Sequence, residues 1–293
     1  MNIRRIAVVG AGLMGSGIAQ ALATPGYEIH LCDVAEEALN KGFAGIEKSL
    51  SRFVKAKHLT EKEAEEVRSR ITGFTDMETA LREVDLVVEA APENMELKKQ
   101  IFHDLDRFTR PDAILATNTS ELSVTAIASA TTRPERVVGM HWFNPPPVMR
   151  LVEIVRGTDT SQETIEMIMQ VSEQAGKETV VVKDVQGFVT SRAISAHMLE
   201  CMRILEEGVA SAEDIDKAVR LGLNYPMGPF ELADYVGLDT MLFASDGMVE
   251  AYGDRFRAPQ TLRKLVEAGH LGRKTGKGFY DYTKKPETVS AKK

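Results

Sequence analysis

The sequence predicts an α/β domain with a doubly wound, mostly parallel sheet, followed by a second domain built only of helices. Short apolar runs alternate with helical segments through the first half of the chain, and a glycine-rich turn joins the first run to the first helix. Beyond about residue 185 the strand-like runs stop and the helical patterns continue. Alternating strands and helices are typical of a parallel sheet with helices on both faces.

Length and composition agree with two globular domains. The chain has 293 residues, which is more than most single cores use. Its 36 basic and 43 acidic residues give a net charge of −7, which disfavours non-specific nucleic-acid binding. No apolar stretch reaches the roughly 18 residues of a membrane-spanning helix, and the N-terminus lacks the pattern of a signal peptide, so we expect no membrane association and a cytoplasmic location.

The two cysteines, Cys32 and Cys201, have neither a close partner nor the spacing of metal ligands. Cys32 ends an apolar run, which favours a buried, reduced thiol. We therefore expect no bound metal.

The first domain is expected to span residues 1–185. Residues 6–9 form an apolar run that ends in glycines, Leu13–Ala23 has the pattern of a helix, and residues 27–32 resemble a second strand. Later strands are expected at residues 86–89, 114–117 and 137–140.

A charged stretch, residues 36–70, interrupts this alternation. Thr60 and Glu63 have the spacing of a capping box, so we predict two helices that form an inserted hairpin. From periodicity alone, a merely decorative solvated hairpin is an equal alternative to a functional one.

The second domain is expected at residues 186–293, after a last strand-like run at residues 179–182. Glycines and prolines separate its helical segments, and its polar tail, residues 284–293, is expected to be disordered. The expected helices are residues 191–207, 212–221 and 240–252.

The glycine-rich turn has the context of a Rossmann-like dinucleotide site, because it follows a strand and opens a helix. Gly10 permits the tight turn, Gly12 lets the backbone approach a pyrophosphate, and Gly15 lets the helix pack closely on the sheet. The alternative is a purely structural turn. The loop residues expected to bind the dinucleotide are Gly10, Gly12, Leu13, Met14 and Gly15.

Asp33 lies eighteen residues after Gly15, at the end of the second predicted strand. An acid at this place accepts hydrogen bonds from the adenosine ribose. No arginine follows it to hold a 2′-phosphate, so NAD is favoured over NADP. The alternative role for Asp33 is a helix N-cap.

His141 is the strongest candidate base among six histidines. We expect it to follow the strand at residues 137–140, at the carboxyl edge of the sheet where open α/β folds bind ligands. Glu153 follows shortly, and a carboxylate beside a catalytic imidazole fixes its tautomer and stabilises its cation. From composition alone, a structural histidine would be the better interpretation; the sequence context reverses that preference.

Motifs along nearly the whole chain resemble those of the L-3-hydroxyacyl-CoA dehydrogenase family, which includes bacterial 3-hydroxybutyryl-CoA dehydrogenases. The motifs are residues 10–15, 88–90, 118–120, 141–145, 147–149, 183–184, 225–232 and 272–280. The resemblance implies reversible, NAD-dependent oxidation of an (S)-3-hydroxyacyl-CoA to a 3-ketoacyl-CoA, with 3-hydroxybutyryl-CoA as the expected substrate. It also implies a homodimer formed through the helical domain.

The resemblance also implies residue roles. His141 matches the catalytic base, Glu153 its partner, and Ser120 a serine that bonds the reacting oxygen of the substrate beside the cofactor. Positions that match cofactor contacts are Glu93, Lys98, Ser120, Asn144 and Lys274. The alternative, non-functional interpretations are a helix cap for Glu93, a surface charge for Lys98 and a turn cap for Ser120.

The hairpin matches the part of the family that helps to hold coenzyme A. Ser49 falls on a CoA-contacting position, whereas a lysine of the family falls on Ala56, between Lys55 and Lys57, either of which is a candidate phosphate contact. Ser191 replaces an asparagine that lies near the catalytic pair in the family, and its shorter side chain offers fewer donors.

These departures leave a related alternative, an L-gulonate-type sugar-acid dehydrogenase with the same His/Glu pair. A catalytically inactive NAD-binding protein is a third possibility, which the presence of Ser120, His141 and Glu153 disfavours.

Overall fold

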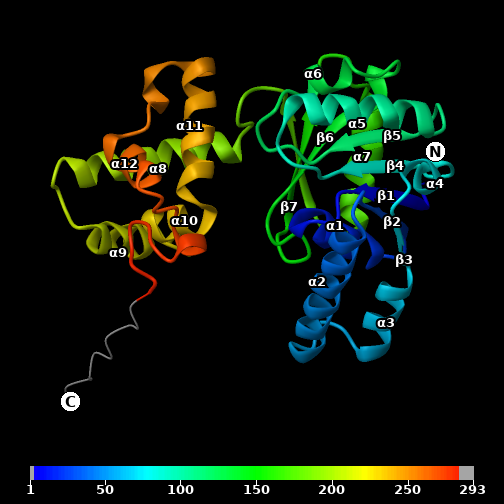
Figure 1. The fold of residues 1–293 in the computed structure, drawn as a ribbon, viewed down its shortest axis with the longest axis horizontal. Helices are drawn as coiled ribbons and strands as arrows, with labels where there is room; N and C mark the ends of the chain where they lie inside the picture. Colours follow the sequence, from blue (N-terminus) through cyan, green and yellow to red (C-terminus); the bar gives the residue numbers. More distant parts are fainter. Residues whose placement is uncertain (1–2, 284–293) are drawn as a thin grey trace. The chain divides into compact units, whose positions relative to one another are not determined.

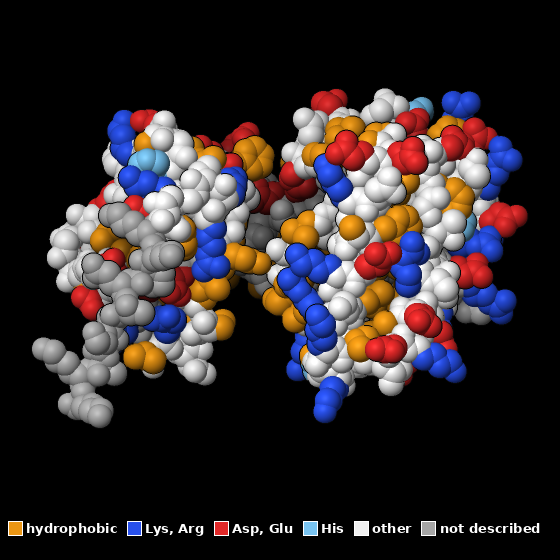
Figure 2. Space-filling view, turned by 60° about the horizontal axis from the view of Figure 1, so that its bottom comes forward, with side chains coloured by type: hydrophobic (Ala, Val, Ile, Leu, Met, Phe, Trp, Pro, Cys, Tyr) orange, Lys and Arg blue, Asp and Glu red, His pale blue; other side chains and the backbone are white. Residues whose placement is uncertain are grey.

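The computed structural model describes residues 3–283, and the predicted disordered tail at residues 284–293 lies outside this range. The chain divides into two compact units, Met1–Phe188 and Val189–Lys293. Figure 1 shows the sheet of the first unit and the helices of the second. Figure 2 shows that both units carry acidic, basic and apolar side chains intermingled on the face drawn.

The first unit contains one eight-stranded sheet in the order β3-β2-β1-β4-β5-β6-β7-β8. Strands β1 to β6 are parallel, β7 runs antiparallel to β6, and β8 is parallel to β7. This confirms the predicted mostly parallel sheet. The strands are β1 (Arg5–Val9), β2 (Glu28–Cys32), β3 (Ile71–Phe74), β4 (Leu86–Glu89), β5 (Ile114–Thr117), β6 (Val137–Trp142), β7 (Leu151–Arg156) and β8 (Glu178–Lys183).

Helices cover both faces of the sheet (Figure 1). Alternate residues of the central strands enter two separate apolar clusters, so that Ile6 and Val8 pack on one face while Ala7 and Val9 pack on the other. Strands buried on both faces have continuous apolar sequences, which explains the runs seen in the sequence. One face packs against α1 (Leu13–Ala23), α2 (Glu36–Lys55), α3 (Glu61–Ser69) and α7 (Gln162–Gln174), and the other against α4 (Met77–Leu81), α5 (Met95–Phe108) and α6 (Val124–Ala128).

The predicted hairpin consists of α2 and α3, which lie side by side and extend beyond the sheet (Figure 1). The capping box is formed: the Glu63 N–H donates to Thr60 Oγ1, and the Thr60 N–H donates to Glu63 Oε2. Leu39, Ile46 and Leu50 of α2 are buried in the same cluster as α1. The inner face of the hairpin is therefore part of the core.

Strand β6 is longer than predicted. His141 does not follow the strand but lies within it, because β6 continues to Trp142. The extension arises from β7, whose residues pair with positions 139–142. A neighbouring strand thus supplies the hydrogen bonds that keep this segment extended.

The second unit is helical, as predicted, and has its own apolar cluster. Two of its helices, α10 and α12, were not expected, because they are short segments flanked by glycine or proline. Cys201 of this unit and Cys32 of the first are both free and buried. The helices are α8 (Thr190–Glu206), α9 (Ala212–Gly222), α10 (Pro229–Val236), α11 (Leu238–Tyr252) and α12 (Gln260–Glu267), and short 3-10 turns occur at Pro134–Arg136, Asp254–Phe256 and Arg273–Thr275.

Two buried aspartates organise the end of the second unit. Asp234 accepts hydrogen bonds from the Phe279 and Tyr280 N–H groups and from the Tyr282 hydroxyl. Asp216 accepts hydrogen bonds from the start of α10 and from the Tyr280 hydroxyl. These bonds fix the segment that carries Lys274. Within residues 3–283, no helix has both the length and the apolar character needed to cross a membrane.

Candidate active site

The glycine loop lies between the carboxyl end of β1 and α1. Gly10 has a φ of +103°, a conformation that favours glycine, and its N–H donates to Cys32 O. A Cβ at Gly15 would lie 1.8 Å from Gly10 O, so only glycine allows the helix to approach the turn. A Cβ at Gly12 would meet no atom within 4 Å, which leaves open space over the backbone.

This open space is at the N-terminus of α1. Gly12 is the N-cap, and no side chain caps the helix. The first N–H groups of a helix have no intrahelical partner and attract anions. The Leu13 side chain is exposed and Met14 is half-buried. The loop therefore has the features that a pyrophosphate requires.

Asp33 follows β2 and lies beside this loop. Its Oδ2 accepts the Ala11 N–H at 2.8 Å, and its Oδ1 accepts the Ala35 N–H at 3.1 Å. The N-cap of α2 is Ala35, not Asp33. The carboxylate is thus anchored to the glycine turn, where it remains a candidate acceptor for ribose hydroxyls.

A buried ionic network lies after β4. Lys98 is 1% exposed, and its Nζ lies 2.7 Å from Glu89 Oε1 and 3.5 Å from Glu93 Oε2. The Lys98 ammonium also donates to Ala91 O, and the Thr117 hydroxyl donates to the other oxygen of Glu89. Lys98 is therefore not a surface charge. In this structure its ammonium contacts the Glu89 and Glu93 carboxylates and Ala91 O.

Glu93 connects this network to the bend after β5. Its Oε1 accepts the N–H groups of Ser120 at 3.0 Å and Glu121 at 3.2 Å, and it also accepts the Thr119 hydroxyl. The cap of α5 is Asn94, so the capping role considered for Glu93 is wrong. The N-cap of α6 is Ser123. Glu93 holds the backbone from which Ser120 projects.

Glu121, next to Ser120, was not identified from the sequence. Its side chain is 9% exposed, and its Oε2 is buried without a hydrogen-bond partner. Burial and the Glu93 carboxylate raise the pKa of Glu121 to about 7. A second acid thus lies close to the bend, and no sequence pattern marks it, because its properties arise from its surroundings.

His141 and Glu153 form a buried pair. The residues are opposite one another in the β6–β7 register, and His141 Nδ1 lies 2.8 Å from Glu153 Oε2. Glu153 is fully buried and His141 is 6% exposed. A carboxylate that accepts from Nδ1–H leaves Nε2 as the nitrogen that exchanges a proton with another group. This arrangement suits general acid–base chemistry.

His141, near the end of β6, and the bend with Ser120, just after β5, lie on neighbouring strands at the carboxyl edge of the sheet. The Trp142 N–H donates to Asn118 Oδ1 at 2.9 Å, which ties the end of β6 to the end of β5. The ring of Phe143 contacts the His141 ring at a centroid distance of 4.5 Å. Asn144, a predicted cofactor contact, is exposed just beyond. The glycine loop follows β1 at the same edge.

A hollow of about 580 Å³ lies between the hairpin and the 145–148 segment. Ser49 lines it, and so does Arg52, an exposed cation one turn before Ala56 that the sequence analysis missed. Lys55 and Lys57 are exposed but are not among its lining residues. Most of the other lining residues are apolar, including Phe53, Leu59, Pro145, Pro147 and Val148, and the polar ones are Gln20, Thr24, His58 and Lys177.

Comparison with protein families decides the classification. The NAD-binding domain of 3-hydroxyacyl-CoA dehydrogenase matches residues 5–185, and the C-terminal domain of 3-hydroxyacyl-CoA dehydrogenase matches residues 187–282. The chain belongs to the 3-hydroxyacyl-CoA dehydrogenase family. The resemblance inferred from the motifs is therefore confirmed.

Individual relatives agree with this family. A probable 3-hydroxybutyryl-CoA dehydrogenase of Bacillus subtilis is 46% identical over 286 residues, which cover 97% of this chain and 99% of the relative. The crystal structure of (S)-3-hydroxybutyryl-CoA dehydrogenase from Ralstonia eutropha superimposes with a TM-score of 0.93 at 43% identity, covering 97% of this chain and 100% of that one. A diketoreductase structure has a TM-score of 0.83 at 28% identity, covering 96% of this chain and 100% of that one.

Two predicted site residues of this family member belong to the second unit. Ser191 is half-buried in the first turn of α8. Lys274 Nζ lies 2.6 Å from both carboxylate oxygens of Asp239. The roles predicted for Ser191 and Lys274 remain proposals.

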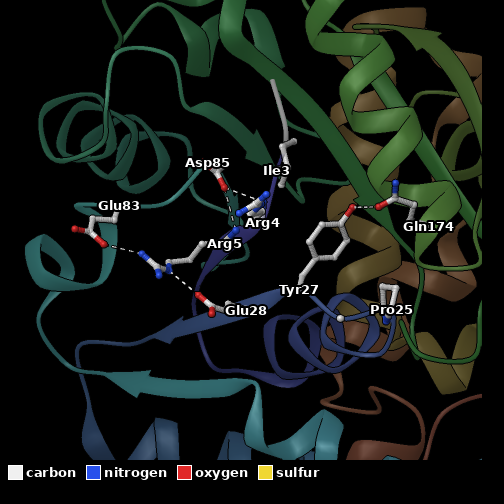
Figure 3. Close-up of a pocket in the computed structure, with 10 residues that line it drawn as sticks. Ile3, Arg4, Arg5, Pro25, Tyr27, Glu28, Glu83, Asp85 and Gln174 are labelled. Carbon is white, nitrogen blue, oxygen red and sulfur yellow. Dashed lines mark hydrogen bonds and ion pairs between the residues drawn. The ribbon is translucent and has the colours of Figure 1, made fainter.

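A second hollow lies at the opposite, amino edge of the sheet, and no histidine is among its lining residues (Figure 3). Arg5 lies between Glu28 and Glu83, and Asp85 accepts the N–H groups of Arg4 and Arg5. These carboxylates are engaged in holding the starts of the strands together. The glycine loop, Ser120 and His141 lie at the carboxyl edge instead.

Proposed function

We propose that this chain catalyses the reversible, NAD-dependent oxidation of a short (S)-3-hydroxyacyl-CoA, such as 3-hydroxybutyryl-CoA, to the 3-ketoacyl-CoA. The observation that carries the proposal is the buried His141–Glu153 pair at the sheet edge that also holds the glycine loop. Membership of the family supports the same reaction. The names of the relatives supply the substrate class.

The proposed chemistry uses three side chains. His141 Nε2 takes the proton of the 3-hydroxyl group, and Glu153 orients the ring and stabilises the imidazolium that forms. The Ser120 hydroxyl donates a hydrogen bond to the developing alkoxide. In the reverse direction His141 returns the proton to the carbonyl oxygen. The positioning network of Glu93 and Lys98 keeps Ser120 in place.

The residues present fit NAD. The space over Gly12, the uncapped start of α1 and the anchored Asp33 are suited to a pyrophosphate and a ribose. When bound, NAD supplies the acceptor for the hydride that leaves the substrate carbon. Further proposed cofactor contacts are Leu13, Met14, Glu93, Lys98, Ser120, Asn144 and Lys274.

Coenzyme A is proposed to lie against the hairpin. The hollow beside Ser49 and Arg52 is mainly apolar with a cation at its rim, which suits a pantetheine chain with phosphates. Lys55 and Lys57 are additional candidate phosphate contacts. Ser191, in the helical domain, is a proposed residue of the catalytic site.

The domain roles extend the proposal. Residues 1–185 form the cofactor domain, and residues 186–293 form the substrate and dimerisation domain. A homodimer through the helical unit is supported by exposed apolar side chains such as Leu221, Leu223 and Phe243. Light scattering tests the dimer.

We also propose a cytoplasmic location, in line with two free, buried thiols.

The decisive experiment follows NADH oxidation by the purified protein with acetoacetyl-CoA, longer 3-ketoacyl-CoAs and 3-dehydro-L-gulonate. Turnover of acetoacetyl-CoA that falls with chain length supports the proposal. Turnover of the sugar acid alone refutes it and favours the gulonate-type alternative. NADH binding without turnover of any substrate would support the inactive, NAD-binding alternative.

A further inference from the structure

Lys177 is a buried lysine in the turn between α7 and β8, outside the glycine loop and the His141–Glu153 pair. It is 7% exposed, and its Nζ donates to Pro146 O at 2.8 Å and to Met149 O at 2.9 Å. Among residues 3–283 it forms no ion pair with a carboxylate. A buried cation is costly unless hydrogen bonds compensate it, and here two main-chain carbonyls do so.

The two carbonyls belong to the connection between β6 and β7, the strands that carry His141 and Glu153. This connection contains three consecutive prolines, residues 145–147, which have no N–H to donate. Its own backbone bonds run from the Val148 and Met149 N–H groups to Pro145 O. The Lys177 ammonium donates to Pro146 O in the middle of the connection and to Met149 O near its end, and so holds these two parts together.

The same connection packs against the helix that follows the glycine loop. A Cβ added at Gly17 of α1 would lie 2.8 Å from the ring of Pro146. The connection therefore touches the predicted dinucleotide-binding helix on one side and the Lys177 ammonium on another. Its position is sensitive to both contacts, because the packing leaves no spare space at Gly17.

We propose that Lys177 is a positioning residue for the dehydrogenase reaction. Its ammonium fixes the 145–149 connection, and through that connection it fixes the opposition of His141 and Glu153 and the placement of Asn144. The inference rests on the proposed function for its catalytic consequence. The structural part, that Lys177 holds this connection in place, is testable without substrate.

Trp142 provides that test, because it is the one tryptophan of the sequence and immediately precedes the connection. Its ring centroid lies 5.6 Å from Lys177 Nζ, and the side chain is 2% exposed. Acrylamide quenching of its fluorescence therefore reports whether this part of the structure has loosened. The signal does not depend on cofactor or substrate.

Three variants isolate the ammonium. Lys177→Met removes the charge and both donors but keeps an apolar stem. Lys177→Arg keeps a cation with donors, and the hollow of about 580 Å³ that Lys177 lines gives the longer side chain room. Lys264→Met is the control, since Lys264 is an exposed residue of α12 paired with Glu267.

For Lys177→Met we expect kcat with acetoacetyl-CoA to fall about tenfold, because small displacements of catalytic groups are costly. The KM for acetoacetyl-CoA should change by less than about twofold, because the Lys177 ammonium is engaged by two main-chain carbonyls and offers little to a ligand in the hollow that it lines. Quenching of Trp142 should increase. Lys177→Arg should recover most of the lost kcat and of the protection of Trp142, and Lys264→Met should match the wild type.

A wild-type kcat in Lys177→Met, even with a lowered Tm, overturns the proposal, because Lys177 would then be merely structural. A lowered kcat with unchanged Trp142 quenching overturns the suggested route through the connection. If the wild type turns over no 3-ketoacyl-CoA, the proposed function fails, whereas Trp142 quenching still decides whether Lys177 holds the connection. If Lys177→Met does not fold, Lys177→Gln replaces it, because its amide keeps a donor.

Discussion

His141 Nδ1 lies 2.8 Å from Glu153 Oε2, and the two residues oppose one another across adjacent antiparallel strands. Directly opposed strand residues have side chains within contact distance, so the sheet itself sets the separation of this pair. Both residues are buried, and the connection between their two strands is held by the Lys177 ammonium. The pair is preorganised by backbone hydrogen bonding.

The first prediction concerns this coupling. His141→Gln should lower kcat by about 10² to 10⁴, the usual loss for a general base, with an unchanged Kd for NADH. Glu153→Gln should also lower kcat, because an amide neither stabilises the imidazolium nor fixes its tautomer to the same extent. Because Glu153 acts through His141, the double variant should be no slower than His141→Gln alone. Steady-state kinetics of the three variants test this, and simple multiplication of the two losses would show that the residues act independently.

The second prediction separates two glycines of one loop. Gly12→Ala should leave Tm unchanged, since Gly12 has a φ of −66° and a Cβ there meets nothing within 4 Å. It should nevertheless weaken NADH binding about tenfold or more, because the methyl group occupies space needed by the pyrophosphate. Gly15→Ala should instead lower Tm, because its Cβ would lie 1.8 Å from Gly10 O. Thermal unfolding and NADH titration distinguish them, and normal NADH affinity in a folded Gly12→Ala protein contradicts the assignment of the loop.

The third prediction concerns Asp33. Asp33→Asn keeps an oxygen that accepts the Ala11 N–H but removes the negative charge and one acceptor. We expect the Kd for NADH to rise about tenfold, because charge-assisted hydrogen bonds to the ribose are replaced by neutral ones. The kcat at saturating NADH should stay close to the wild type. Fluorescence titration measures the Kd, and an unchanged value argues against the ribose contact.

The fourth prediction concerns pH and Glu121. Its pKa is about 7 in the folded protein against an ordinary value of 4.5. As pH rises from about 4.5 to 7, the unfolded chain loses this proton before the folded protein does, so the stability contributed by the site falls, by roughly 3 kcal/mol in all. Glu121→Gln removes this loss. The free energy of unfolding of the variant should therefore exceed that of the wild type at pH 8 and match it near pH 4.5.

Urea unfolding at the two pH values tests this difference, with Glu65→Gln on the exposed face of α3 as the control. The control should show no pH-dependent gain. An equal effect of both substitutions would indicate a general effect of net charge rather than the buried carboxyl group.

The sequence alone was sufficient for the α/β class, the glycine loop, the helical hairpin and the pairing of His141 with Glu153 as candidates. Each depends on residues that are near in sequence or that repeat with the period of a helix or a strand. Even there, the structure corrected a boundary: His141 lies inside β6 because pairing with β7 prolongs the strand. Edge strand β3 and helices α10 and α12 were missed, since short segments near glycine or proline carry little periodicity.

The tertiary structure alone decided how the surrounding charges are used. Glu93 reaches the Ser120 bend across 27 residues, and Lys177 reaches Pro146 across 31. Lys98, for which a surface charge was the alternative to a cofactor contact, is buried against Glu89. Local patterns record hydrophobic periodicity and turn chemistry. The burial, partners and protonation of a charged side chain depend on which distant segments pack around it, and only the folded chain brings those segments together.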